Sequence, residues 1–107
     1  MVTLLEKLER GEVVSPAASK EMIAILKRQQ FKEGIGRHLE DEWVASKSGS
    51  LDALRSDVGL VYAPKGRVAI AVTVDDMPSV DYSPDNAGNI LISNLAKLVL
   101  EGLGAMD

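Results

Sequence analysis

The chain has 107 residues, of which 46% are hydrophobic, and this length suits one domain with a modest core. Its formal net charge of -4 argues against a nucleic-acid backbone as partner, because such binding needs a concentrated positive surface. No apolar run is long enough to span a membrane, and the acidic start at Glu6 is unlike a secretory signal peptide. The sequence lacks cysteine, so cysteine usage does not indicate a redox compartment.

Two helices are predicted at the N-terminus, within about residues 3–30. Thr3-Leu4-Leu5-Glu6 has the form of a capping box, and Gly11 is the residue type that commonly follows a helix end. The first helix is therefore expected over about residues 4–10. Ser15-Pro16 has the form of an N-cap followed by proline at the first helical position, and it predicts a second helix that ends near Gln30.

Three strands are predicted within about residues 42–74. Trp43–Lys47 and Asp57–Tyr62 contain strand-compatible residues, and Pro64-Lys65-Gly66 has turn composition. Arg67–Val74 is apolar nearly throughout, which predicts a strand covered on both faces. The short connections predict an antiparallel meander.

A polar loop and a long terminal helix are predicted to complete the chain. The loop from Asp75 to Asn89 is interrupted by two prolines, and the helix is expected over about residues 85–103. Its predicted apolar face consists of Ala87, Leu91, Leu95, Leu98 and Gly102, widened by Ile90 and Val99. The predicted fold class is α+β, with two N-terminal helices, a three-stranded antiparallel sheet and a long C-terminal helix in a single domain over residues 1–107.

The triplet Lys47-Ser48-Gly49 begins at the last residue of the first predicted strand. A Lys-Ser/Thr-Gly triplet on a strand is one of three signatures of penicillin-binding serine enzymes and class A β-lactamases. The triplet, the downstream Arg55 and the order of elements together resemble the C-terminal portion of such a protein. The resemblance covers about Thr3 to Leu103 and implies a partial β-lactamase/transpeptidase-like fold.

The resemblance also implies roles for five residues. Lys47 would raise the local positive potential and aid proton shuttling, and Ser48 would bind the substrate carboxylate. Gly49 would leave room for ligand beside the strand, and the backbone N–H of Ser50 would form one arm of the oxyanion hole. Arg55 would be a second carboxylate anchor on the adjacent strand.

A simpler reading is available for the same residues. The triplet can be a strand end that enters a glycine turn, since such triplets recur by chance. Arg55 can be a surface cation with a solvated partner such as Asp52 or Asp57.

Two of the three family signatures are missing from these 107 residues. No serine is followed by lysine at the third position, and Ser56-Asp57-Val58 lacks the asparagine of Ser-Asp-Asn. The order of parts in the family would place the missing segments before Met1. Because a serine nucleophile needs a base within hydrogen-bonding range, we expect the isolated chain to form no acyl-enzyme.

Two functions follow as hypotheses. In the first, the chain is part of a serine β-lactamase-type hydrolase that acts on β-lactams or D-alanyl peptides, in the periplasm or outside the cell as its relatives do. In the second, it is a non-enzymatic association module. In the family the last strand pairs with a strand of the N-terminal part, so Arg67–Val74 is expected to be an unpaired edge here. That edge would bind the missing N-terminal half or a second copy of the chain.

The remaining chemistry-bearing residues favour structural roles. His38 is expected to be a solvated loop residue, and Trp43 is expected to pack at a strand start. Asp75, Asp76, Asp81, Asp85 and Asn86 offer clustered oxygens, which hard cations prefer. Their spacing is not that of a calcium loop, so neither a metal nor another cofactor is expected.

Overall fold

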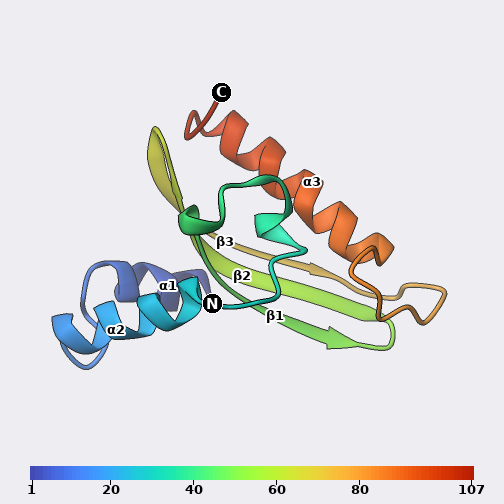
Figure 1. Cartoon of the computed structure of the whole chain (residues 1–107), viewed down its shortest axis with the longest axis horizontal. Helices are drawn as coiled ribbons and strands as arrows, with labels where there is room; N and C mark the ends of the chain where they lie inside the picture. The colour runs from blue at the N-terminus through green and yellow to red at the C-terminus, as the bar shows by residue number, and fades with distance from the viewer.

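The computed structural model describes all 107 residues, with the predicted order of helices and strands (Figure 1). The elements are α1 (Val2–Glu9), α2 (Pro16–Lys27), β1 (Val44–Leu51), β2 (Leu54–Ala63), β3 (Gly66–Val74) and α3 (Ala87–Gly102). Two short 3-10 helices, η1 (Ile35–His38) and η2 (Asp41–Trp43), precede β1. The predicted α+β class is confirmed. No helix combines the length and apolar character needed to cross a membrane.

The two N-terminal helices start in different ways. At α2 the Ser15 hydroxyl accepts a hydrogen bond from the Ala18 backbone N–H at 3.0 Å, as the N-cap prediction required. The capping box predicted for α1 is wrong, because this helix begins at Val2 and has no side-chain cap. Thr3 therefore lies inside the helix, where its hydroxyl cannot serve as an N-cap. Gly11 follows the helix end with φ of +75°, a left-handed conformation that glycine adopts without strain.

The sheet is an antiparallel meander in the order β1-β2-β3. Lys47 lies opposite Val58, and the β1–β2 pairing continues to the pair Leu51 and Leu54 at the hairpin tip. The strands therefore extend beyond the predicted ranges. The prediction missed this extension because the residues near the tip are polar or small and give no periodic signal.

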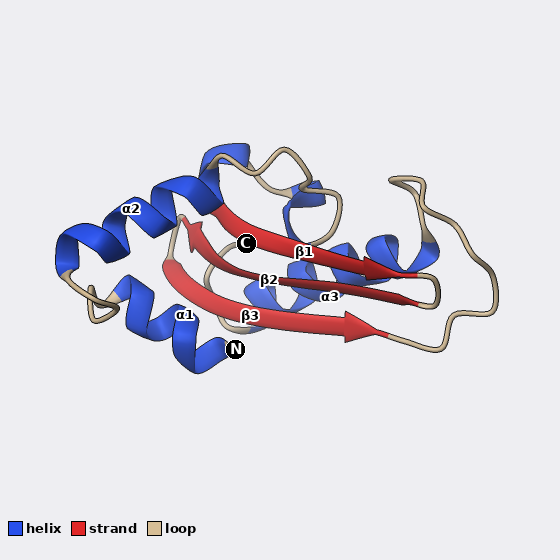
Figure 2. Cartoon of the chain, turned by 90° about the horizontal axis from the view of Figure 1, so that it is seen from below, coloured by secondary structure: helices blue, strands red, loops and turns tan.

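Helices cover both faces of the sheet, so adjacent strand residues belong to different cores. Leu60 packs with Leu5 and Leu8 of α1, whereas Val61 packs with Ile92 of α3. This division follows from the strand geometry, because successive side chains point to opposite faces. Figure 2 shows α3 behind the three strands, while α1 and α2 lie toward one end of the sheet.

The prediction that β3 is covered on both faces is wrong for much of the strand. Ile70 is its only fully buried residue, and Ala71 and Thr73 are exposed. The physical reason is that α1 and α2 cover only one end of that face (Figure 2). On its outer edge β3 has no partner strand, because it is the last strand of the sheet.

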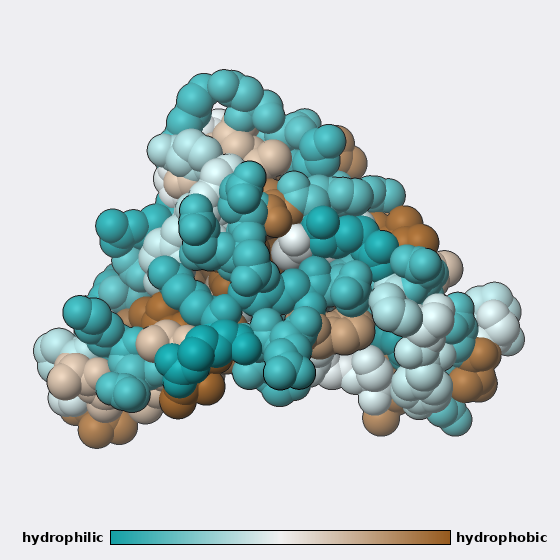
Figure 3. All heavy atoms as spheres, viewed as in Figure 1, coloured by the Kyte–Doolittle hydropathy of each residue, from teal (hydrophilic) through white to brown (hydrophobic).

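The face of α3 that packs on the sheet also differs from the predicted one. The buried residues are Gly88, Asn89, Ile92, Ser93, Ala96 and Leu100. The predicted stripe is exposed, with Leu91 at 46% and Leu98 at 63% relative exposure. Both faces of this helix carry apolar residues, so hydrophobic periodicity could not identify the face that packs. Figure 3 shows apolar residues along the outer side of α3 and near the α1–α2 pair.

Candidate functional site

The Lys-Ser-Gly triplet lies in the second half of β1, where the strand leaves the core. Lys47 is exposed, and its ammonium donates a hydrogen bond to the Ser48 carbonyl oxygen at 2.7 Å. Gly49 and Ser50 are exposed as well. A Cβ atom added to Gly49 would meet no other atom within 4 Å. The packing of this chain therefore does not require glycine at this position.

Strand pairing places Arg55 beside the triplet. Arg55 lies on β2 directly opposite Ser50, and Ser48 lies opposite Asp57. Because side chains alternate along a strand, Ser48, Ser50 and Arg55 share one face of the sheet. Lys47 points to the other face, where it borders an apolar groove. Three of the five predicted residues, Ser48, Ser50 and Arg55, thus share one face, whereas Lys47 and the side-chain position of Gly49 belong to the other face.

The surroundings of Arg55 were not predicted. The residue is only 2% exposed, and its guanidinium donates hydrogen bonds to the carbonyl oxygens of Leu51 at 2.6 Å, Leu54 at 2.7 Å and Asp81. It also lies 4.7 Å from the centre of the Tyr82 ring, in a cation–π arrangement. The alternative reading of Arg55 as a surface cation paired with a carboxylate is therefore wrong.

The loop between β3 and α3 holds Arg55 in place. The Tyr82 hydroxyl donates to the Asp52 carboxylate at 2.6 Å, and this bond raises the pKa of the Tyr82 phenol. Asn86 caps α3 through its side-chain oxygen and donates from its amide nitrogen to the Asp81 carbonyl at 2.8 Å. The contact between Tyr82 and Asp52 joins residues 30 positions apart, so motif and periodicity arguments could not reveal it, whereas the Asn86 cap is a local contact.

The carboxylates of the same loop have local partners instead of a shared centre. Asp75 accepts a hydrogen bond from the Asp76 N–H at 2.7 Å, and Asp81 accepts one from the Ser83 N–H at 2.8 Å. The Asp85 carboxylate forms an ion pair with Arg37 at 3.1 Å. No three acidic, histidine or cysteine side chains are grouped so that they could hold a metal ion.

His38 and Trp43 lie outside the predicted site. His38 is the exposed last residue of η1, and its Nε2 atom is 3.4 Å from the Ser93 hydroxyl oxygen. Trp43 is half-buried at the end of η2, one residue before the strand that it was expected to start. Neither side chain approaches the triplet within hydrogen-bonding distance.

Asp57, which the sequence analysis considered only as a solvated partner of Arg55, is a buried carboxyl group with 2% relative exposure. It accepts a hydrogen bond from the Ile35 backbone N–H at 2.9 Å, while its second oxygen has no partner. Burial raises the pKa of Asp57 above its ordinary value of 3.8 to about 6, although the Ile35 N–H acts in the opposite direction. A Cβ atom on Gly34 would come within 2.6 Å of the carboxylate, so glycine is needed for this contact.

An apolar groove of about 370 Å³ borders Lys47 on the opposite face of the sheet. Its walls come from α1, α2 and β2, and its lining residues are Met1, Leu4, Leu5, Leu8, Met22, Ile25, Leu26, Lys47 and Val58. Lys47 is the only charged side chain in this lining.

The sequence matches the beta-lactamase enzyme family over residues 1–103. A search of curated proteins gives no match. Among solved structures, the chain is similar to a beta-lactamase from Sphaerobacter thermophilus, with 28% identity and a TM-score of 0.85 over 99% of this chain and 40% of that one. A beta-lactamase from Chitinophaga pinensis matches with 25% identity and a TM-score of 0.81 over 95% of this chain and 40% of that one.

The fold is also similar to that of the protein PBP-A, with 24% identity and a TM-score of 0.80. That match covers 98% of this chain and 38% of PBP-A. The chain thus spans about 40% of the length of the beta-lactamases that it resembles.

Proposed function

Because this chain belongs to the beta-lactamase enzyme family, we propose that it supplies the carboxylate-binding and oxyanion side of a serine acyl-transfer site. The substrates would be β-lactams or D-alanyl peptides, whose carboxylate would be held while a serine attacks the carbonyl carbon. We place this activity in the periplasm or outside the cell, by analogy with the family.

The open space beside Gly49, which lies on the Lys47 face of the sheet, is the observation that carries the proposal. Gly59 on β2 provides the contrast, since a Cβ there would lie 2.8 Å from the Ala45 carbonyl oxygen. Packing therefore explains the glycine at position 59 but not the one at position 49. A ligand that approaches the β1 backbone closely would explain it, because only glycine leaves the backbone uncovered.

The proposed roles follow from the positions of the side chains and the backbone. Ser48 would donate its hydroxyl hydrogen to the substrate carboxylate, and the Ser50 N–H would stabilise the oxyanion of the tetrahedral intermediate. Arg55 would supply positive charge beside that carboxylate, held in a fixed orientation by its three carbonyl partners. Lys47 would act from the opposite face, where it would raise the potential around the attacking serine.

In this proposal, the nucleophile and its base are assigned to a polypeptide segment outside these 107 residues, because the residues contain neither Ser-x-x-Lys nor Ser-Asp-Asn. Three uncovered surfaces support docking of such a segment. They are the groove beside Lys47, the outer edge of β3 and the exposed apolar side of α3. Of these three surfaces, only the groove is lined by Lys47, so a segment docked there would bring its serine close to the Lys47 ammonium.

Fragment complementation tests this function. The 107-residue chain would be mixed with the part of the Sphaerobacter thermophilus beta-lactamase that it does not cover, and hydrolysis of a chromogenic β-lactam would be followed. We expect hydrolysis from the mixture and none from either part alone. Lys47→Ala should abolish the gain, whereas Lys65→Ala in the exposed turn between β2 and β3 should leave it unchanged.

Two results would contradict the proposal. One is association of the two parts, seen by light scattering, without any acyl-enzyme detectable by intact mass. The other is equal hydrolysis by mixtures that contain wild-type chain and the Lys47→Ala variant.

A second candidate function is a non-enzymatic association module, and the unpaired edge of β3 favours it. Residues 67–74 would then pair with the same strand of a second copy. Light scattering of the chain alone distinguishes the candidates. A dimer that Ala71→Lys disrupts would favour the module, whereas a monomer at high concentration would exclude it.

A further inference from the structure

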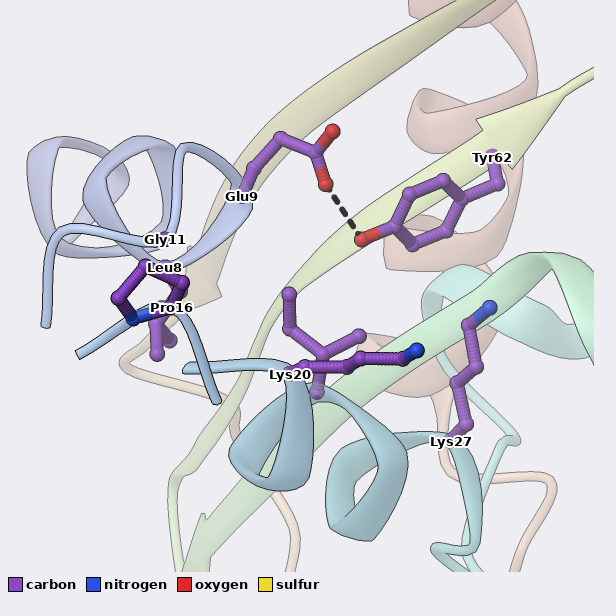
Figure 4. A pocket seen from close by; sticks show the side chains of 8 residues that line it. Leu8, Glu9, Gly11, Pro16, Lys20, Lys27 and Tyr62 are labelled. Carbon is purple, nitrogen blue, oxygen red and sulfur yellow. Dashed lines mark hydrogen bonds between the residues drawn. The ribbon is translucent and has the colours of Figure 1, made fainter. Parts of the chain in front are cut away.

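A hollow of about 310 Å³ lies between the end of α1, the length of α2 and the end of β2 (Figure 4). Its apolar surface comes from Leu8, Pro16 and Ile23, and its polar groups are Glu9, Lys20, Lys27 and Tyr62. This volume is at the lower end of the range of small-molecule sites, which is about 300–1,000 Å³.

The negative charge in the hollow is already neutralised. The Glu9 carboxylate accepts a hydrogen bond from the Tyr62 hydroxyl at 2.7 Å and forms an ion pair with Arg67, which approaches from β3. Burial and the neighbouring Glu9 carboxylate together raise the pKa of the Tyr62 phenol, so it remains a neutral donor. Glu9 is thus occupied within the protein and leaves the two lysines as the uncompensated charges of the hollow.

The two lysines have no carboxylate partners within the chain, unlike the cations in its six ion pairs. Lys20 and Lys27 are seven residues apart on α2, which places them on the same side of the helix about 10 Å apart along its axis. Figure 4 shows both side chains directed into the hollow. The Lys27 ammonium lies 4.4 Å from the centre of the Tyr62 ring. This aromatic face helps to hold the cation but leaves it without a counter-ion.

We propose that the hollow binds a small amphiphilic anion, with one carboxylate or phosphate group on an apolar body. The anionic group would lie between the Lys20 and Lys27 ammonium groups, where it would complete two charge-assisted hydrogen bonds. The apolar body would cover exposed Pro16 and half-buried Ile23 in the lining. A wholly polar anion would leave that surface in water and bind more weakly.

This site is distinct from the proposed acyl-transfer site. Tyr62 lies four residues beyond Val58 on β2, and Val58 is the partner of Lys47, so the two regions are about 13 Å apart along the strand. Binding in the hollow can therefore be present when β-lactam chemistry is absent, and the reverse is also possible.

Titration of the 107-residue chain with phenyl phosphate, phenylacetate and inorganic phosphate tests the proposal, with backbone NMR shifts as the readout. We expect saturable shifts at Gly11, Ile23 and Tyr62 with at least one phenyl ligand. The preferred phenyl ligand identifies the anionic group. Inorganic phosphate should bind at least about tenfold more weakly, which corresponds to about 1.4 kcal/mol.

Charge-removing variants provide the control. Lys20→Gln and Lys27→Gln should each weaken binding of the preferred ligand at least several-fold, and the double variant should abolish it. Lys97→Gln removes an exposed helical lysine on α3 and should change nothing. Absence of saturable shifts, equal affinity for inorganic phosphate, or full affinity in the folded double variant would each overturn the proposal.

Discussion

The two ends of the β1–β2 ladder are built differently. At one end Val44, Ala45, Leu60 and Val61 are buried and face helices on both sides of the sheet. At the other end β1 is largely exposed from Lys47 onward. We call these the core end and the open end. The comparison indicates that folding depends on side-chain burial at the core end. At the open end, the exposed polar residues of β1 are not required for packing.

The largest expected effect is at the core end. Ile92 is 1% exposed and packs with Val61, so Ile92→Ala should lower the free energy of unfolding by about 2–5 kcal/mol. Leu98 on the other side of the same helix is 63% exposed, and Leu98→Ala should have little effect. Urea denaturation measures both. Equal losses would show that the exposed side of α3 is covered in solution.

Asp57 lies where the two ends meet, and it predicts a pH dependence. Its pKa is raised from 3.8 to about 6 by burial, so folding favours the protonated form. The stabilisation is complete below pH 4 and is lost as pH rises through 6, an effect of roughly 3 kcal/mol. Stability of the wild type should therefore fall between pH 4 and 7 relative to Asp57→Asn. Parallel stability curves for the two proteins would refute this prediction.

A pair of glycine substitutions compares the ends directly. Gly59→Ala introduces a Cβ 2.8 Å from the Ala45 carbonyl oxygen and 2.9 Å from the Ser46 Cβ, and should cost about 1–3 kcal/mol. Gly49→Ala meets no atom within 4 Å, and its stability should stay within about 0.5 kcal/mol of wild type. The proposed function adds that Gly49→Ala should reduce hydrolysis in the complementation assay while leaving folding intact.

The smallest stability change is expected at the open end. Tyr82 is exposed, and its ring and hydroxyl cover Arg55 and bind Asp52. Tyr82→Ala should leave the urea midpoint nearly unchanged but accelerate hydrogen exchange at the Arg55 side chain, measured by NMR. Tyr82→Phe keeps the ring and should retain slow exchange. Identical exchange in all three proteins would mean that the carbonyl partners alone protect Arg55.

Much of the fold could be predicted from the sequence because local signals were strong. Ser15-Pro16 marked the start of α2, and Pro64-Lys65-Gly66 marked the turn between β2 and β3. The face of α3 could not be predicted, because Ile92 and Leu100 lie on one side and a longer apolar stripe lies on the other. Which side packs depends on tertiary contacts, and hydrophobic periodicity does not report these.

The candidate site could be predicted only as a set of residue types. The triplet and Arg55 were identified by their resemblance to a family motif, and the pairing of Ser50 with Arg55 places them side by side. The burial of Arg55 depends on Asp81 and Tyr82, which are 26 and 27 residues further along the chain. Such contacts have no short-range sequence signal. The same applies to Asp57, whose partner Ile35 lies 22 residues before it.

The outer edge of β3 has a consequence for the handling of this protein. Residues 68–74 have the sequence Val-Ala-Ile-Ala-Val-Thr-Val, without charge, proline or glycine, and the strand has no neighbour on one side. Segments of this length and composition stack into cross-β fibrils when their backbone groups are free. Arg67 and Asp75 flank the segment with opposite charges and act as gatekeepers at its ends. Fibril growth from this edge is therefore expected to set the upper limit on the concentration and storage time of the purified chain.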